Sequence, residues 1–224
     1  MGNTPGKSTK RKHEPSTDRR PAPVGRARLA QALSTLTTPG RTTETISRRW
    51  RGGTAQLHDE WCYAAIEETI LTAFGLPSES QEERAYRDIR DRCAIGDTAQ
   101  MPPALRKLLG LVPETAVELP PYAEAKRRYG KKLTAALGGA PGMFRLDRDE
   151  ITVRQSAELS LEEVRATIDA DGLIAFGDAA HWRVIFGYTS DDRVLVFDPF
   201  NGGKEEVWTW ERVSEKWQFG YHVT

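Results

Sequence analysis

The sequence feature that most constrains the fold is a change of pattern near Pro141. Before this point, helix signals recur: apolar residues lie three and four positions apart, and prolines, Ser-x-x-Glu motifs and glycines mark the ends of these stretches. They predict helices over 62–74, 80–92, 104–109 and 120–137, the last interrupted at Gly130. After Pro141, short apolar runs separated by turn residues indicate strands instead.

The second half of the chain is therefore predicted to be mostly β-structure. One helix interrupts it, opened by the capping box Ser160-Leu-Glu-Glu163 and reaching about Ala170. Strands are expected over 143–146, 151–153, 173–176, 182–189, 193–197, 206–210 and 218–223. A helical half (46–140) followed by an antiparallel sheet half (141–224) is the pattern of an α+β fold.

A basic segment precedes this domain. Residues 1–50 hold eleven Lys or Arg against three Asp or Glu, although the whole chain has 32 of each kind. Residues 1–45 are rich in Pro, Ser and Thr and poor in aromatics, so we expect a disordered basic leader. Its clusters at 10–12 and 19–20 are better explained by solvation than by nucleic-acid binding, which is not expected. Whether the leader is an export segment or a removable pro-region stays open.

Composition excludes several classes of protein. No apolar run approaches the ~18 residues that span a bilayer, and no secretory signal opens the chain. Only Cys62 and Cys93 are present, so we expect neither a disulfide framework nor a zinc site, and no cofactor is implied. A cytoplasmic monomer is the default expectation, with non-classical export as an effector left open. The sequence names no activating partner.

Cys62 is the candidate nucleophile. It opens the first predicted helix, and a helix N-terminus favours a thiolate because its unpaired N–H groups and dipole stabilise an anion. Gln56, six positions earlier, supplies an amide that can donate to an oxyanion together with the backbone N–H of Cys62. A buried, inert cysteine is the plainer alternative, and it is how we interpret Cys93.

His181 and Asp198 complete a candidate triad. His181 follows two alanines and precedes an apolar run, and it is the expected general base. Asp198 ends a predicted strand 17 positions later, where its carboxylate would orient the imidazole. His58 is the second choice of base, but it lies only four residues before the thiol.

Three aromatic residues adjoin the candidate triad. Trp61, Tyr63 and Trp182 flank Cys62 and His181 in the sequence and are expected to wall a substrate cleft. The remaining tryptophans are expected in the core or at sheet edges.

The stretch 56–224 resembles the papain-like cysteine proteases of the compact bacterial type. That group includes effector proteases, and the bacteriocin-leader peptidases are more distant relatives. The matched pieces are Gln56-x5-Cys62, His181 before a strand ending Gly187-Tyr188, and a strand ending Asp198-Pro199. The gap of 119 residues between Cys62 and His181 is close to the ~130–150 of papain-type chains.

The resemblance implies a metal-free hydrolase of peptide bonds that works through an acyl-enzyme, and a protein or peptide as its substrate. A bacterial effector, a toxin or a self-processing protease fits this expectation. In the family the residue after the cysteine is usually Trp and here is Tyr63, and the one before the histidine is usually Gly and here is Ala180. Both departures bear on pocket shape more than on the reacting atoms.

Two other functions stay open at this point. The same triad on a papain fold also serves deamidases and transglutaminases, which act on glutamine side chains. A catalytically degenerate module that holds a peptide without cutting it is the second alternative.

Overall fold

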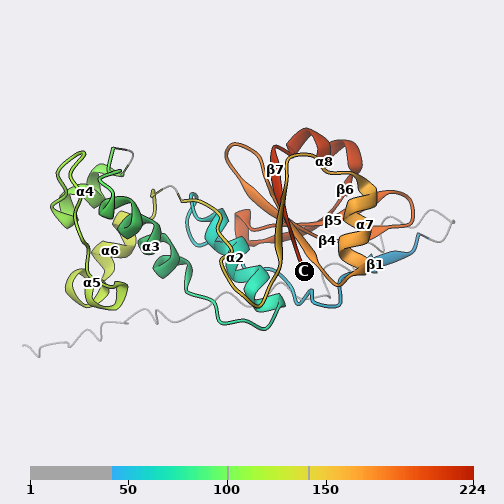
Figure 1. The fold of residues 1–224 in the computed structure, drawn as a ribbon, viewed down its shortest axis with the longest axis horizontal. Coiled ribbons are helices and arrows are strands. Elements are labelled where there is room, and N and C mark those ends of the chain that lie inside the picture. The colour runs from blue at the N-terminus through green and yellow to red at the C-terminus, as the bar shows by residue number, and fades with distance from the viewer. Residues whose placement is uncertain (1–41, 100, 141) are drawn as a thin grey trace, which may run out of the picture.

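The computed structural model describes residues 42–99, 101–140 and 142–224. A lobe of helices lies beside a lobe built on one antiparallel sheet, and helix α2 (Cys62–Ala73) lies between them (Figure 1). The predicted α+β class is therefore confirmed. Residues 1–41, which make up most of the expected leader with its two basic clusters, lie outside the described residues, so their predicted disorder stays a prediction.

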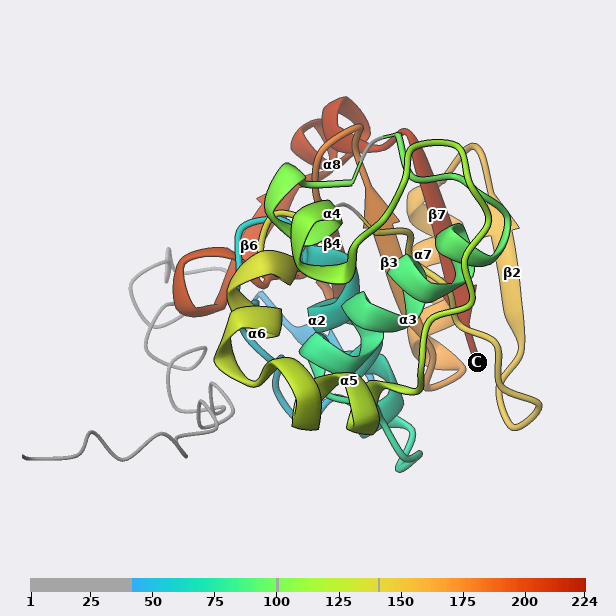
Figure 2. The ribbon, with the colours of Figure 1, turned by 90° about the vertical axis from the view of Figure 1, so that its left-hand side faces the viewer.

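The helical lobe follows the predicted start and stop signals. The Ser80 side chain accepts a hydrogen bond from the Glu83 backbone N–H at the start of its helix. Gly110 and Gly130 end theirs with φ of 67° and 55°, a region that favours glycine. Figure 2 shows this lobe facing the viewer. Its helices are α3 (Gln81–Ala94), α4 (Pro103–Leu109), α5 (Tyr122–Tyr129) and α6 (Lys131–Leu137).

The second lobe contains a seven-stranded antiparallel sheet with the spatial order β2-β7-β3-β4-β5-β6. The seventh strand, β1, pairs with residues 187–189 of β4, beyond Ile185, where the pairing of β4 with β3 stops. The strands are β1 (Glu44–Ile46), β2 (Val153–Ser156), β3 (Leu173–Gly177), β4 (Trp182–Thr189), β5 (Arg193–Asp198), β6 (Lys204–Thr209) and β7 (Phe219–Val223).

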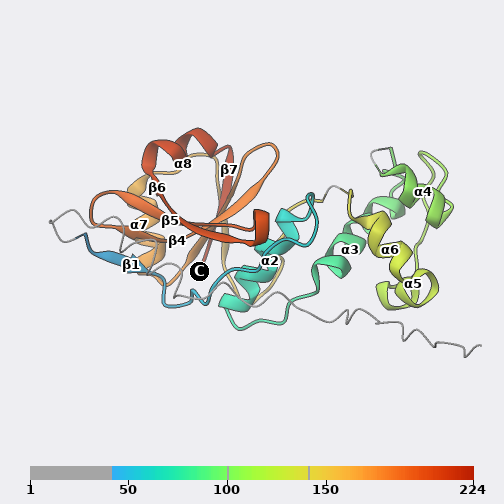
Figure 3. The same ribbon diagram turned by 180° about the vertical axis from the view of Figure 1, so that it is seen from behind.

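Both faces of the sheet are buried. Alternate residues of β3, such as Leu173 and Ala175, join the core shared with α2 and the helical lobe. The residues between them, such as Ile174 and Phe176, join a second core under α7 (Leu161–Asp169) and α8 (Trp210–Lys216). Figure 3 shows α2 on the near side of the sheet and α7 behind it. The sheet therefore holds α2 at a fixed place against its strands.

Three differences from the sequence predictions are found. The strand β1 reaches into the last residues of the expected leader, so the folded part begins before residue 46. Trp210 begins α8 instead of ending a strand, because the Thr209 side chain caps a helix by accepting the Arg212 N–H. The predicted strand 143–146 is wrong, since this segment pairs with no other strand.

Candidate active site

Cys62 is the first residue of α2 and faces a cleft of about 580 Å³, which lies between the start of this helix, the segment 142–144 and the sheet. The cysteine is only 5% exposed. No side chain caps the N-terminus of this helix, so its first backbone N–H groups are not taken up by a capping residue. The thiol therefore stands where free amides and the helix dipole favour negative charge.

His181 comes to the same cleft from the turn between β3 and β4. The Asp178 N–H donates to the His181 carbonyl at 3.1 Å, and the Asp178 carboxylate accepts the Ala180 N–H at 3.0 Å. This turn places the imidazole one residue before β4. Its Nε2 lies 2.7 Å from Oδ1 of Asp198, and His181 lines the cleft together with Cys62. Because Nε2 is engaged, Nδ1 is the ring nitrogen available to the thiol.

Asp198 is fixed from two sides at the end of β5. Its Oδ1 accepts the Phe200 backbone N–H at 2.9 Å, and its Oδ2 accepts the Arg183 Nε–H at 3.0 Å. Sheet register explains the second contact, since the pairing of Val184 with Phe197 brings the next residues, Arg183 and Asp198, side by side.

Arg183 was not singled out from the sequence. A second bond from its guanidinium reaches Asp178 at 3.2 Å, so one side chain joins the turn before His181 to the carboxylate behind it. No local signal in the sequence marks Arg183, because its contact with Asp198 depends on the register of β4 against β5.

The imidazole and its carboxylate partner have shifted pKa values. Burial lowers the pKa of His181, but the hydrogen bonds to Asp198 and to Cys62 and the Asp198 charge outweigh it and raise this pKa to about 9. For Asp198, burial acts to raise the pKa, yet the His181 hydrogen bond and the nearby positive groups hold it below its ordinary range. The arrangement favours an imidazolium beside a carboxylate.

Gln56 lies near the site but its amide group is engaged. Its Nε2 donates to the carbonyls of His58 at 2.9 Å and Asp59 at 2.8 Å, so both N–H bonds hold the loop before the helix. Its backbone N–H donates to the Pro199 carbonyl at 3.0 Å, which ties this loop to the segment after Asp198. Its assignment as an oxyanion donor stays a prediction and requires one of these bonds to be released.

Trp61 does not wall the cleft, which corrects the sequence expectation. Its side chain is fully buried, and its indole N–H donates to the Leu137 carbonyl at 3.2 Å, so it anchors the start of α2 to the end of α6. His58 packs edge-on against this indole and is absent from the cleft lining among the described residues. The alternative base is therefore placed away from the thiol's cleft.

Tyr63 and Trp182 do line the cleft. Trp182 stacks on Phe144 with ring centroids 4.5 Å apart and on Tyr221 at 5.9 Å, and Phe219 lies against it at 5.0 Å. Together these rings make one side of the cleft apolar. Tyr63 is 1% exposed, and burial raises the pKa of its hydroxyl above the ordinary value.

The second thiol lies at the end of α3 and does not line the cleft. Cys93 is completely buried, and burial raises its pKa to about 11. Within the described residues no group of three metal-ligating side chains is found, and no helix there is long and apolar enough to cross a membrane.

Comparisons with known proteins show a distant likeness to solved structures. No family model matches the chain, and a search of curated proteins gives no match. Among solved structures, the chain is similar to the peptidase domain of Streptococcus ComA, a bifunctional ABC transporter involved in a quorum-sensing pathway. The identity is 14%, the match covers 76% of this chain and 95% of that chain, and the TM-score is 0.37. A TM-score this low lends no support to the site, which rests on the distances above.

Proposed function

We propose that this protein is a papain-like thiol hydrolase acting on peptide bonds, with Cys62 as nucleophile, His181 as general base and Asp198 as the group that orients the imidazole. One observation carries the proposal: His181 lines the same cleft as Cys62, and its Nε2 lies 2.7 Å from Asp198, which leaves Nδ1 for the thiol. A nucleophile, a base and an orienting acid in this order form the minimum constellation for acyl transfer.

The reaction follows from the positions of these atoms. His181 takes the proton of the Cys62 thiol, and the resulting thiolate attacks the carbonyl carbon of the scissile amide. The tetrahedral intermediate collapses when the amine leaves with the proton from His181, and a thioester remains on Cys62. Water then loses a proton to His181 and attacks the thioester, which releases the acid and returns the proton to the thiol.

The oxyanion needs donors at the start of α2. The Cys62 backbone N–H is the nearest, since it belongs to the uncapped first turn of the helix. The Gln56 amide joins it only if the substrate displaces one of the two carbonyls that Gln56 now contacts. Removing a single oxyanion donor costs roughly 10²–10³ in kcat, so Gln56→Ala measures whether this rearrangement occurs.

Alkylation kinetics test the proposal without a known substrate. The rate of Cys62 labelling by iodoacetamide is followed from about pH 5 to about pH 10 and located by mass spectrometry, with the buried Cys93 as an internal control. We expect fast labelling at about pH 6 that is lost in His181→Ala. Labelling that begins only near the ordinary thiol pKa of ~8.5 and ignores the histidine substitution overturns the proposal and favours a module that only binds peptide.

A second measurement separates peptide cleavage from side-chain chemistry. Incubation with a peptide library yields new N-termini if the acceptor is the backbone amide. Release of ammonia without cleavage assigns the same triad to glutamine deamidation or transglutamination instead. Both activities are expected to vanish in Cys62→Ala, provided that its circular dichroism matches that of the wild type.

A further inference from the structure

The segment 142–145, here called the strap, is held by carboxylates instead of by a neighbouring strand. The Met143 N–H donates to Asp88 Oδ2 at 2.9 Å, and the Arg145 N–H donates to Glu67 Oε1 at 2.5 Å. Alternate N–H groups of an extended chain point to the same side, so the strap presents the two donors together. The side chains of α2 and α3 thus take the place of a sheet partner.

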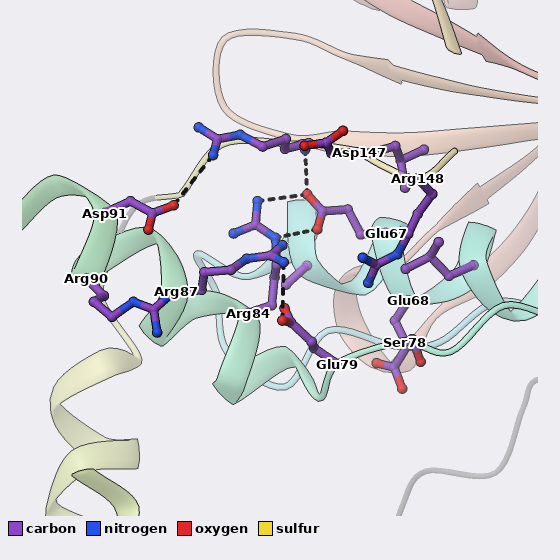
Figure 4. Close-up of a pocket in the computed structure, with 14 residues that line it drawn as sticks. Glu67, Glu68, Ser78, Glu79, Arg84, Arg87, Arg90, Asp91, Asp147 and Arg148 are labelled. Carbon is purple, nitrogen blue, oxygen red and sulfur yellow. Dashed lines mark hydrogen bonds and ion pairs between the residues drawn. The ribbon is translucent and has the colours of Figure 1, made fainter. Parts of the chain in front are cut away.

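Arg84 joins the two carboxylates under the strap. Its Nε and Nη2 both donate to Glu67, the latter at 3.0 Å, and Figure 4 shows the guanidinium against the Glu67 carboxylate. Its Nη1 donates to Asp88 at 2.5 Å, and Nη2 also reaches the Met143 carbonyl at 2.6 Å. Arg84, Glu67 and Asp88 therefore form one hydrogen-bonded cluster with the strap.

Burying this cluster costs desolvation free energy, because all three side chains can carry a charge. Arg84, Glu67 and Asp88 are 3%, 4% and 6% exposed, and two carboxylates share one guanidinium. Burial raises the pKa of Glu67 to about 7, even though Arg84 and the Arg145 N–H oppose the shift. Apolar side chains of similar volume often stabilise a protein as well as a buried ion pair does, so fixing a geometry is the better explanation for retaining the charges.

The strap is also a wall of the cleft. Gly142, Met143 and Phe144 line the cleft beside Cys62, while the carboxylate-bound side of the strap faces a separate hollow of about 280 Å³ on the outside. Tyr63, the residue after Cys62, packs between the strap and Arg84. A Cβ on Gly142 would fall 1.9 Å from its ring, and the Arg84 guanidinium lies 5.3 Å from the ring centroid.

We propose that Arg84, with Glu67 and Asp88, is a positioning device that sets the place of the strap and thereby the binding of peptide beside Cys62. The proposal rests on the thiol hydrolase function proposed above, because it assigns the strap to the substrate. These three residues touch no reacting atom. They act through the backbone of residues 142–145, so their loss weakens peptide binding while the reactivity of the thiol is kept.

Asp88→Asn and Asp91→Asn form a matched pair for the test. Both residues lie on α3, but Asp88 is buried in the cluster, whereas Asp91 is half exposed and pairs only with the Arg145 side chain at 3.5 Å. Asn has the shape of Asp, but an NH₂ donor replaces one of the two carboxylate oxygens. Asn at position 88 therefore cannot keep both the oxygen that accepts from Arg84 and the one that accepts from the Met143 N–H. Arg84→Lys is the second variant, because one ammonium cannot reproduce the fork between two carboxylates.

Two readouts are compared in each folded variant. The first is amide hydrogen exchange at Met143 and Arg145, which reports the strap directly and needs no activity. The second is the ratio of two Cys62 labelling rates, one with iodoacetamide and one with a phenylalanine-containing dipeptidyl chloromethyl ketone. Iodoacetamide is too small to depend on the strap, whereas the dipeptide must lie along it.

We expect Asp88→Asn and Arg84→Lys to speed exchange at the strap by about tenfold or more, because a charge-assisted hydrogen bond is lost. Labelling by the dipeptidyl reagent is expected to slow at least about fivefold, with iodoacetamide labelling within about twofold of the wild type and Asp91→Asn unchanged in both. Unchanged exchange, or equal slowing of both reagents, overturns the inference. Slow iodoacetamide labelling of the wild type overturns the hydrolase function instead, and the exchange data still decide whether the cluster holds the strap.

Discussion

Replacing Asp198 with Asn tests the electrostatics of the candidate triad most directly. The carboxylate raises the pKa of His181 through a hydrogen bond and through its charge, while burial and the Arg183 guanidinium lower it. Asn keeps an acceptor for the Nε2–H but removes the charge. Because the negative charge and the charge-assisted part of the hydrogen bond are lost, we expect the pKa to fall from about 9 toward its ordinary value of about 6.5.

The size of the effect on stability follows from the same shift. A change from 6.5 to about 9 corresponds to about 3 kcal/mol, at about 1.4 kcal/mol per pH unit, and His181 is only 15% exposed, so little of it is screened. Because the pKa is raised on folding, this stabilisation is fully present below about pH 6.5 and is lost as the pH rises through about 9. In Asp198→Asn most of this pH dependence should disappear.

Two measurements check these values without a substrate. Titration of the imidazole Cε1 protons by NMR gives the pKa, and His181→Gln identifies the signal among the four histidines. Denaturant unfolding at about pH 6 and about pH 9.5 gives the change in the free energy of unfolding. A wild-type His181 that titrates near 6.5, or a pKa that Asp198→Asn leaves in place, refutes the assignment of Asp198 as its partner.

Two further substitutions probe the surroundings of the triad. Arg183→Met removes a charged donor from both Asp198 and Asp178, so we expect a loss of about 1–3 kcal/mol in the free energy of unfolding; a change below about 0.5 kcal/mol by denaturant titration would contradict this role. Gly142→Ala places a methyl group 1.9 Å from the buried Tyr63 ring. We expect it to lower the free energy of unfolding by about 1–3 kcal/mol and to slow labelling by the dipeptidyl reagent. Gly139→Ala is the control, because its Cβ would meet its nearest neighbour only at 4.0 Å.

Local signals in the sequence explain most of the helical lobe. Helix ends depend on the immediate neighbours of a residue, so Ser80, Gly110 and Gly130 predicted theirs from chemistry that acts within one turn. The strand β1 was missed because three residues carry too short a pattern, and its pairing with β4 is fixed by contacts more than 140 positions away.

The strap shows why an extended pattern does not guarantee a strand. Residues 143–146 alternate as strand residues do, and their backbone is free to donate to any acceptor of the right spacing. Carboxylates on α2 and α3 supply the acceptors, and no feature of residues 143–146 themselves indicates this pairing. Tertiary contacts, and not propensity, decided the outcome.

The structure brings Cys62 and His181 to one cleft and places Asp198 beside the imidazole, as the sequence suggested, but the sequence did not indicate the residues that support them. Cys62 and His181 were found because a thiol at a helix start and an isolated histidine before a strand are uncommon combinations. Arg183 was missed because its contact with Asp198 depends on the register of β4 against β5, which cannot be predicted from the sequence alone. Trp61 was misplaced because proximity along the chain says nothing about the direction in which an indole points.

The place of β7 in the sheet has a consequence for biosynthesis. This strand is the last one among the described residues, yet it lies between β2 and β3, so the sheet has a gap in its middle until residues 219–223 have left the ribosome. Phe219 and Tyr221 of the same strand line the cleft. A nascent chain therefore carries Cys62 long before the strand that completes its groove, and the cleft beside the thiol is finished only after β7 has joined the sheet.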